Sequence, residues 1–214
     1  MISVIIPACN EEKYIYKTLN SIKKQRHNKE IIVVCNGCTD NTYKIAKKYT
    51  KKVFNLKERN VSKARNHGAK KAKGNILVFL DADTHLTNNC LKKIHEALDS
   101  SIVIGTCKGS PGSKKLFYKL IIGVKNNLWW NYWVNGILFC KKDIFHKVKG
   151  FNEGKTIKEN RDLIKRAVNH GKFCLADTKV VNSMRRFEKL GSSNVALFWL
   201  KSIINNKEKY EIIR

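Results

Sequence analysis

The sequence is poor in acidic residues: 17 Asp and Glu stand against 43 Lys and Arg in 214 residues, a formal charge of +26. The lysines are spread over the whole chain and do not form a tail. A field of this sign attracts polyanions, which include nucleic acids, anionic lipids and phosphorylated substrates. A Lys-rich composition with solvated faces is the alternative explanation for most of the excess.

Proline and long apolar runs are scarce as well. Two prolines and twelve glycines leave no room for a long disordered linker, which predicts one large domain or a domain with an appendage. A hydrophobic content of 43% is enough for a buried core. A spanning helix needs ~20 consecutive apolar residues, and lysines and asparagines interrupt the best candidate, residues 116–140.

The seven cysteines are scattered and odd in number, which favours a reducing compartment over a disulfide framework. Cys35 and Cys38 have CxxC spacing, but no second pair completes a metal site, and the six histidines show no metal-ligand spacing. The chain opens directly on a strand-like run, so we predict no signal peptide. The expected location is cytoplasmic, either free or peripheral on the cytoplasmic face of a membrane.

Apolar runs and helical patterns alternate over the first ninety residues, which is typical of a parallel sheet with crossover helices. We expect Pro7 to stop the first strand, and Asn10 to cap a helix with Glu11 and Glu12 in its first turn. Expected strands are 2–6, 31–35, 53–54, 75–80, 102–106 and 136–140. Expected helices are the one after Asn10, 40–49, 61–74, 88–98, 113–130, 158–170 and 186–204.

Two acids follow the strongest strand, in the segment FLDAD. In open α/β sheets, ligands bind outside the carboxyl ends of the strands. If the backbone stays extended, Asp81 and Asp83 share one face, with Ala82 opposite. Mg²⁺ typically takes one or two carboxylates plus substrate phosphates. The pattern therefore predicts Mn²⁺ or Mg²⁺ at Asp81 and Asp83, with a helix N-cap pair as the structural alternative.

Five segments give the chain its resemblance to a known family. It resembles a family 2 glycosyltransferase with the GT-A fold, in the order and spacing of the family's motifs. The segments are SVIIPACNEEKYI (3–15), IIVVCNGCTDNT (31–42), VSKARNHGAKKAKGNILVFLDAD (61–83), GILFCKKDIFHKVKGFNE (136–153) and ENRDLIKR (159–166).

The resemblance implies a fold and a set of roles. The fold is α/β: a Rossmann-like, mostly parallel sheet flanked by helices over residues 1–184, with a C-terminal helical extension over 185–214. Asp83, together with Asp81, would hold the divalent cation. The nucleotide-sugar pocket would be formed by Pro7, Asn10, Glu11, Asn36, Asp40, Lys63, Arg65, Asn66, Asp81 and Ala82.

The first departure from the family pattern is Cys35-Asn36-Gly37-Cys38, where the family commonly has Asp-Asp-Gly-Ser. An aspartate there accepts an N–H from the base, whereas Asn36 offers one acceptor and two donors. The donor base is therefore left open.

The second departure is Glu159-Asn160, where the family's Glu-Asp motif supplies the general base. An amide takes no proton at neutral pH, so three accounts compete. Glu159 or Asp162 serves as the base, the protein is inactive, or the acceptor needs no base. We favour the last, because a phosphate monoester has a second pKa of about 6 and is already ionised at pH 7. A polyprenyl phosphate, the acceptor of the family's dolichyl-phosphate sugar synthases, would fit; a saccharide hydroxyl is the other acceptor class.

Two further segments bear on the acceptor. Arg185 and Arg186 follow an expected strand, and guanidinium groups bind phosphates in bidentate fashion. The segment NNLWWNYWVNG (126–136) includes Trp130, which we place at the acceptor. With VALFWLKSII (195–204) and the positive charge, it suggests docking on an anionic membrane. A core-facing aromatic cluster is the alternative.

The sequence thus predicts a metal-dependent, inverting sugar transfer from a nucleotide donor by direct displacement. A catalytically inactive nucleotide-sugar-binding protein is the main alternative. A basic nucleic-acid-binding module is a weaker one, because the chain has no recognised nucleic-acid motif, and we expect no specific nucleic-acid partner.

Overall fold

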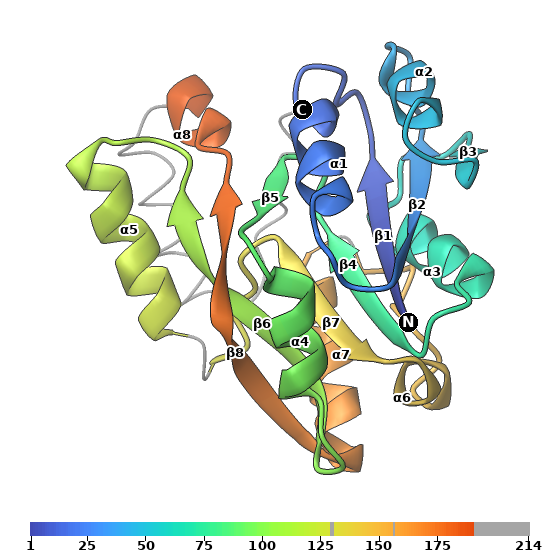
Figure 1. Cartoon of the computed structure of the whole chain (residues 1–214), viewed down its shortest axis with the longest axis vertical. Helices are drawn as coiled ribbons and strands as arrows, with labels where there is room; N and C mark the ends of the chain where they lie inside the picture. The colour runs from blue at the N-terminus through green and yellow to red at the C-terminus, as the bar shows by residue number, and fades with distance from the viewer. Residues whose placement is uncertain (129–130, 156, 191–214) are drawn as a thin grey trace.

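The computed structural model describes residues 1–128, 131–155 and 157–190. One mixed sheet runs through this part of the chain, in the order β3-β2-β1-β4-β7-β6-β8-β5 (Figure 1). Its strands are β1 (Ile2–Ala8), β2 (Lys29–Asn36), β3 (Val53–Leu56), β4 (Ile76–Leu80), β5 (Thr84–Leu86), β6 (Ile102–Pro111), β7 (Ile137–Lys141) and β8 (Lys172–Asn182).

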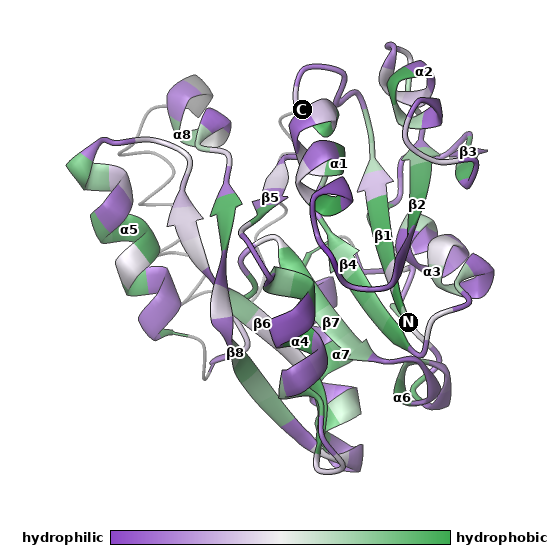
Figure 2. Cartoon of the chain, in the orientation of Figure 1, coloured by the Kyte–Doolittle hydropathy of each residue, from purple (hydrophilic) through white to green (hydrophobic). Residues whose placement is uncertain are grey.

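Helices cover both faces of the sheet. The helices are α1 (Ile15–Lys23), α2 (Thr42–Lys47), α3 (Val61–Lys71), α4 (Cys90–Ala97), α5 (Leu116–Asn127), α6 (Lys142–Lys147), α7 (Glu159–Ala167) and α8 (Arg185–Leu190), with a short 3₁₀ turn, η2 (Val168–His170). Apolar residues of α1, α2 and α4 pack in one core layer, and those of α3, α6 and α7 in the other. The central strands between these layers are apolar (green in Figure 2).

The expected alternation of strands and helices is confirmed in the first half of the chain. β3, β2, β1 and β4 are neighbours and pair in parallel. β1 and β4 are buried on both faces, which suits continuous apolar runs such as ILVFL in β4. The second half differs, because β7 enters antiparallel between β4 and β6. The carboxyl ends of β1, β2 and β4 still meet at one edge.

Two expectations about the first crossover are wrong. β1 continues through Pro7 to Ala8, because the β1–β4 pairing ends at Ile5 and Pro7 has a ladder neighbour in β2 alone. α1 begins at Ile15, not just after Asn10. Asn10 has φ 54°, a left-handed conformation that asparagine tolerates, so its side chain serves the turn and caps no helix.

The DAD segment is also not extended. β4 ends at Leu80, and the amide of Thr84 donates to the Asp81 carbonyl at 3.0 Å, which closes a turn. The Thr18 hydroxyl from α1 fixes this turn by donating to the Ala82 carbonyl at 2.7 Å. The simple alternation that would put Asp81 and Asp83 on one face therefore does not apply.

The last described helix, α8, packs on α5. Met184 and Phe187 form a small apolar cluster with Tyr118 and Ile122 of α5. The expected helix over 186–204 lies outside the described residues beyond 190, so the boundary at 184/185 stays a prediction. None of the helices in the described ranges is long and apolar enough to cross a membrane.

Candidate functional site

The loops after β1 and β2 are joined by polar side chains, as the rule for strand ends predicts. The Asn10 amide donates to the Thr39 hydroxyl at 3.1 Å, and its oxygen accepts from the Thr39 amide at 2.8 Å. Asp40 accepts from the backbone amides of Glu12 at 3.0 Å and Thr42 at 2.9 Å. Burial opposes the charge of Asp40, but hydrogen bonds with the Thr42 side chain and with these backbone amides outweigh it and lower its pKa. Asp40 is therefore an ionised acceptor at the rim of the site.

Below this rim lies the segment that departs from the family pattern. Asn36 is 1% exposed, and its side-chain oxygen has no hydrogen-bond partner among the described residues. The Cys38 thiol donates to the Ala8 carbonyl at 3.3 Å, and the neighbouring Cys35 thiol, against the effect of burial, lowers the pKa of Cys38 to about 7. A buried oxygen without a partner is costly. The expected contact between Asn36 and the donor base stays a prediction.

Arg65 connects the DAD turn to Glu159 and Asn160 at the start of α7. Its side chain, 6% exposed, donates to Asp81 at 3.1 Å, to Glu159 at 3.0 Å and to Asn160 at 3.2 Å. The Phe151 ring lies 5.1 Å from its guanidinium carbon. Since Arg65 is fixed by three partners and a ring, it holds these groups at defined positions.

The other two α3 candidates are turned to nearer partners. Lys63 pairs with Glu58 at the surface. The Asn66 amide donates to the Phe151 carbonyl and to Glu153, both at 2.9 Å, and its oxygen accepts from the Phe151 amide at 2.9 Å. Asn66 therefore holds the loop between α6 and α7.

Arg185, the first residue of α8, enters the site from the far end of the chain. Its guanidinium pairs with both oxygens of Glu11, at 2.6 and 2.7 Å, and with Asp83 at 3.1 Å. The Tyr14 ring lies 4.5 Å away. The other two residues predicted to contact the acceptor cannot be placed relative to the site. Trp130 lies outside the described residues, and so does the side chain of Arg186.

The two α7 acids face different partners. Glu159 contacts Arg65, whereas Asp162 pairs with Lys155 and, at 2.7 Å, with Arg166. Burial would raise the pKa of Asp162, but the hydrogen bonds from Lys155 and Arg166 outweigh it and lower the pKa. Of the two, Glu159 is joined through Arg65 to the DAD turn.

The residues present fit a divalent cation. Asp81 and Asp83 are 44% and 22% exposed and offer hard carboxylate oxygens. Among the described residues, no group of three or more His, Cys, Asp or Glu side chains gathers as a closed metal cage. Two carboxylates suffice where phosphates and waters complete the shell. Arg185 at 3.1 Å from Asp83 shows that this carboxylate takes a cationic partner in the fold.

Sequence reasoning missed the residues that support the site. Tyr14 and Phe151 each contact an arginine that lies far away in sequence. The residues next to Tyr14 and Phe151 in the sequence suggest only ordinary core positions. They do not indicate a contact with a distant arginine. The family segments 3–15 and 136–153, which contain these two residues, were the only hint of a site role.

The family model described as "Glycosyl transferase family 2" matches residues 3–183. The poly(ribitol-phosphate) beta-N-acetylglucosaminyltransferase TarS of Staphylococcus aureus is 36% identical over 123 residues, which is 51% of this chain and 21% of that protein. A dolichol-phosphate mannosyltransferase of Pyrococcus furiosus is 33% identical over 132 residues, 56% of this chain and 38% of that protein. The chain thus spans well under half the length of these relatives.

The fold is similar to that of a solved mannosyltransferase from Pyrobaculum calidifontis in complex with GDP-Man and Mn²⁺. The TM-score is 0.71 at 18% identity, covering 97% of this chain and 65% of that chain. At this sequence identity, the similarity shows a shared fold and nothing about function. The expected GT-A architecture, a mixed sheet flanked by helices, is confirmed.

Proposed function

The chain belongs to glycosyltransferase family 2, and from this premise we propose that it transfers a sugar from a nucleoside-diphosphate donor to an acceptor. The observation that carries the proposal is that the carboxyl ends of β1, β2 and β4 meet at one edge of the sheet. At this edge Asp81 and Asp83 lie beside Arg65 and Arg185, and we assign the nucleoside to Asn36 and Asp40. The relatives' names and the Mn²⁺ complex of the similar structure support it.

We propose that Asp83, with Asp81, holds Mn²⁺ or Mg²⁺ against the donor diphosphate. A bound metal ion stabilises the charge that develops on the leaving diphosphate. The remaining nucleotide-pocket roles, at Pro7, Asn10, Glu11, Lys63, Asn66 and Ala82, are part of the same proposal. Arg65 would orient Asp81, since it holds that carboxylate directly.

The acceptor we propose is a phosphate monoester carried by a lipid. Asn160 supports it, because its amide accepts from Arg65 and cannot act as a base. An ionised phosphate oxygen attacks without losing a proton, displaces the nucleoside diphosphate and inverts the sugar carbon. If the acceptor is a hydroxyl, the base is Glu159, since Asp162 is held by two cations. The variant Asn160→Asp distinguishes them, because it should raise transfer to hydroxyl acceptors and leave phosphate acceptors unaffected.

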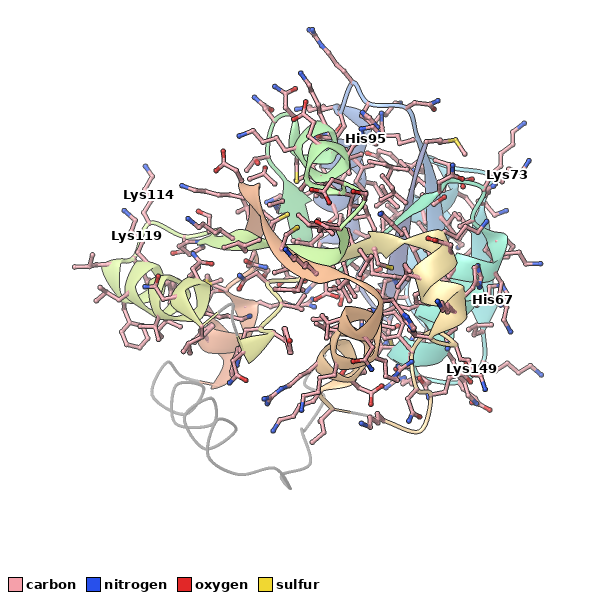
Figure 3. All side chains as sticks on the ribbon, turned by 90° about the horizontal axis from the view of Figure 1, so that it is seen from below. His67, Lys73, His95, Lys114, Lys119 and Lys149 are labelled. Atoms are coloured by element: carbon pink, nitrogen blue, oxygen red, sulfur yellow. The ribbon has the colours of Figure 1, made fainter. Side chains whose placement is uncertain are left out.

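We also propose that the chain docks peripherally on the cytoplasmic face of an anionic membrane. Residues 100–142 contain seven lysines and no Asp or Glu. On α5, Leu116, Phe117, Leu120 and Val124 are 43–70% exposed. Figure 3 shows Lys114 and Lys119 extending away from this helix. Apolar side chains between lysines fit a surface of anionic lipid.

The first test is donor binding in the presence of Mn²⁺. We expect one UDP-sugar or GDP-sugar to raise the melting temperature, since a ligand at a hundredfold excess over its Kd stabilises by ~2.7 kcal/mol. The double variant Asp81→Asn, Asp83→Asn should lose this shift, whereas Asp177→Asn, which removes a surface acid, should keep it. An unchanged shift in the double variant would contradict the proposed cation site.

An inactive nucleotide-sugar-binding protein is the second candidate, and Asn160 is the observation that favours it. Slow hydrolysis of the bound donor with Mn²⁺, measured as release of the nucleoside diphosphate, separates the two. Binding without any release or transfer would support the inactive protein.

A further inference from the structure

Arg185 lies between two acids, Glu11 and Asp83, that come from distant parts of the chain. Glu11 follows β1, and Asp83 follows β4. Figure 1 shows α8, which begins with Arg185, at the end of the sheet where β1 and β2 also terminate. The guanidinium is mostly buried beside these acids. This places a built-in cation at the carboxylate proposed for the metal.

The two contacts of Arg185 are unequal. The Glu11 contact is bidentate, at 2.6 and 2.7 Å, and the Glu11 side chain is 5% exposed. The Asp83 contact is a single one at 3.1 Å to a more exposed carboxylate. Removing the cation from a buried carboxylate is strongly unfavourable, whereas a single contact to the more accessible Asp83 is easier to replace. Glu11 is therefore the permanent anchor, and Asp83 is the exchangeable partner.

We propose that Arg185 is a positioning residue that holds Asp83 until a divalent cation and the donor diphosphate arrive together. Arg185 then stays on Glu11, releases Asp83 to the cation and donates its freed N–H to the diphosphate. This rests on the proposed function, because the diphosphate is what replaces Asp83 as the second partner of the guanidinium.

The consequence is a coupling between the two ligands. A cation that arrives alone must displace Arg185 from Asp83 and lie beside its positive charge. A nucleoside diphosphate compensates the guanidinium and removes that cost. By linkage, each ligand raises the affinity for the other by the same factor.

The packing around Arg185 allows this local exchange. Met184 and Phe187, on either side of it, are buried against Tyr118 and Ile122, so the start of α8 is fixed to α5. Burial disfavours the charged form of Arg185, but the hydrogen bond to Glu11 and the charges of Asp83 and Glu11 outweigh it and raise its pKa. The guanidinium is charged at every working pH, so the exchange is driven by ligand and not by protonation.

The test measures Mn²⁺ binding from the free-ion electron paramagnetic resonance signal, without nucleotide and with UDP or GDP. For the natural chain we expect one nucleotide to tighten Mn²⁺ binding at least tenfold, within the usual range of about 5–150-fold for coupled sites. In Arg185→Gln, Mn²⁺ alone should bind about tenfold more tightly, and the coupling should fall to about threefold or less. Arg185→Lys, which keeps the charge but not the bidentate geometry, should lie between them.

The matched control is Lys93→Gln, which removes the same charge from a surface pair with Asp177. It accounts for the general repulsion of Mn²⁺ by a chain of charge +26 and should behave like the natural chain. Arg185→Lys replaces Arg185→Gln if the latter does not fold. Unchanged Mn²⁺ affinity in the Arg185 variants would overturn this inference alone. Failure of both nucleotides to bind the natural chain with Mn²⁺ would instead overturn the proposed function and this inference with it.

Discussion

At the scale of single residues, Arg65 determines which groups meet. It comes from α3 and contacts Asp81, 16 positions away, and Glu159, 94 positions away. Asn160 takes part through the same nitrogen as Glu159. Because Asn160 stands where the family has an aspartate, the residues around Arg65 carry one negative charge less. The same change removes the residue that serves the family as the general base. The two acids of α7 consequently have separable roles.

Glu159→Gln and Asp162→Asn should have different effects. With the proposed phosphate acceptor, Glu159→Gln keeps kcat within about tenfold, because the nucleophile needs no base; loss of a general base would cost about 10²–10⁴-fold. Asp162→Asn should instead lower the free energy of unfolding by about 1–3 kcal/mol, since it breaks the ties to Lys155 and Arg166. Transfer kinetics and urea unfolding measure the two effects. A large kcat loss in Glu159→Gln would assign that residue as the base.

At the scale of elements, Glu30 joins the start of β2 to its neighbours. Its carboxylate accepts from the Ser3 hydroxyl of β1, from Lys52 before β3 and from the Lys73 and Gly74 amides before β4. Burial would raise its pKa, but these bonds outweigh it and lower the pKa to about 2. One ionised side chain thus joins the parallel strands at the edge opposite the site.

The depressed pKa of Glu30 predicts a stability that depends on pH. Its contribution is complete above the unfolded pKa of about 4.3 and is lost as pH falls toward the folded value of about 2. Glu30→Gln should therefore lower the free energy of unfolding at pH 7 by on the order of 2–3 kcal/mol, and the difference should shrink between pH 4.5 and 2. Glu96→Gln, at an exposed i,i+4 pair with Lys92, should change it by about 0.5 kcal/mol or less at either pH. A pH-independent difference would contradict this account.

At the scale of the whole molecule, the charge is unevenly placed. The acid-free stretch 100–142 includes α5 and its exposed apolar side chains. The aromatic cluster that the sequence placed at a membrane is only partly described. Within it, Tyr132 packs edge-on to Phe173 with ring centres 5.3 Å apart, against the core. Tyr132 therefore fits the core-facing alternative, docking by the rest of the aromatic cluster stays a prediction, and α5 is a second candidate surface.

Membrane docking through α5 can be tested with two charge-matched variants. Leu120→Glu removes an exposed apolar side chain and adds a negative charge, whereas Asn127→Glu adds the same charge on the same helix. Losing a buried Leu costs about 1.5–3 kcal/mol and one charge about 1 kcal/mol. Leu120→Glu should therefore weaken binding to anionic vesicles at least tenfold more than Asn127→Glu. Cosedimentation at low and high salt measures this, and equal loss in both variants, or no binding by the natural chain, would contradict docking by this face.

The sequence by itself determined the alternation of strands and helices, the acids after β4 and the family motifs. These are local signals: apolar periodicity reports which residues are buried, and a motif keeps its residues close along the chain. Prediction from the sequence was wrong where the local preference of a segment competes with its tertiary contacts. Asn10 resembled a helix cap but lies in a left-handed turn that joins Thr39, and Asp81–Asp83 looked extended but form a turn held by Thr18.

Only the tertiary structure decided which distant charges meet. Arg65 reaches Glu159 because α7 packs on the same sheet face as α3, and Arg185 reaches Glu11 across 174 positions because β8 returns to the edge where β1 ends. The antiparallel entry of β7 between β4 and β6 sets this order of strands, and no local pattern encodes it. Long-range pairing depends on how the sheet is assembled. The candidate site residues could therefore be predicted from the sequence, whereas their contact partners could be identified only in the folded structure.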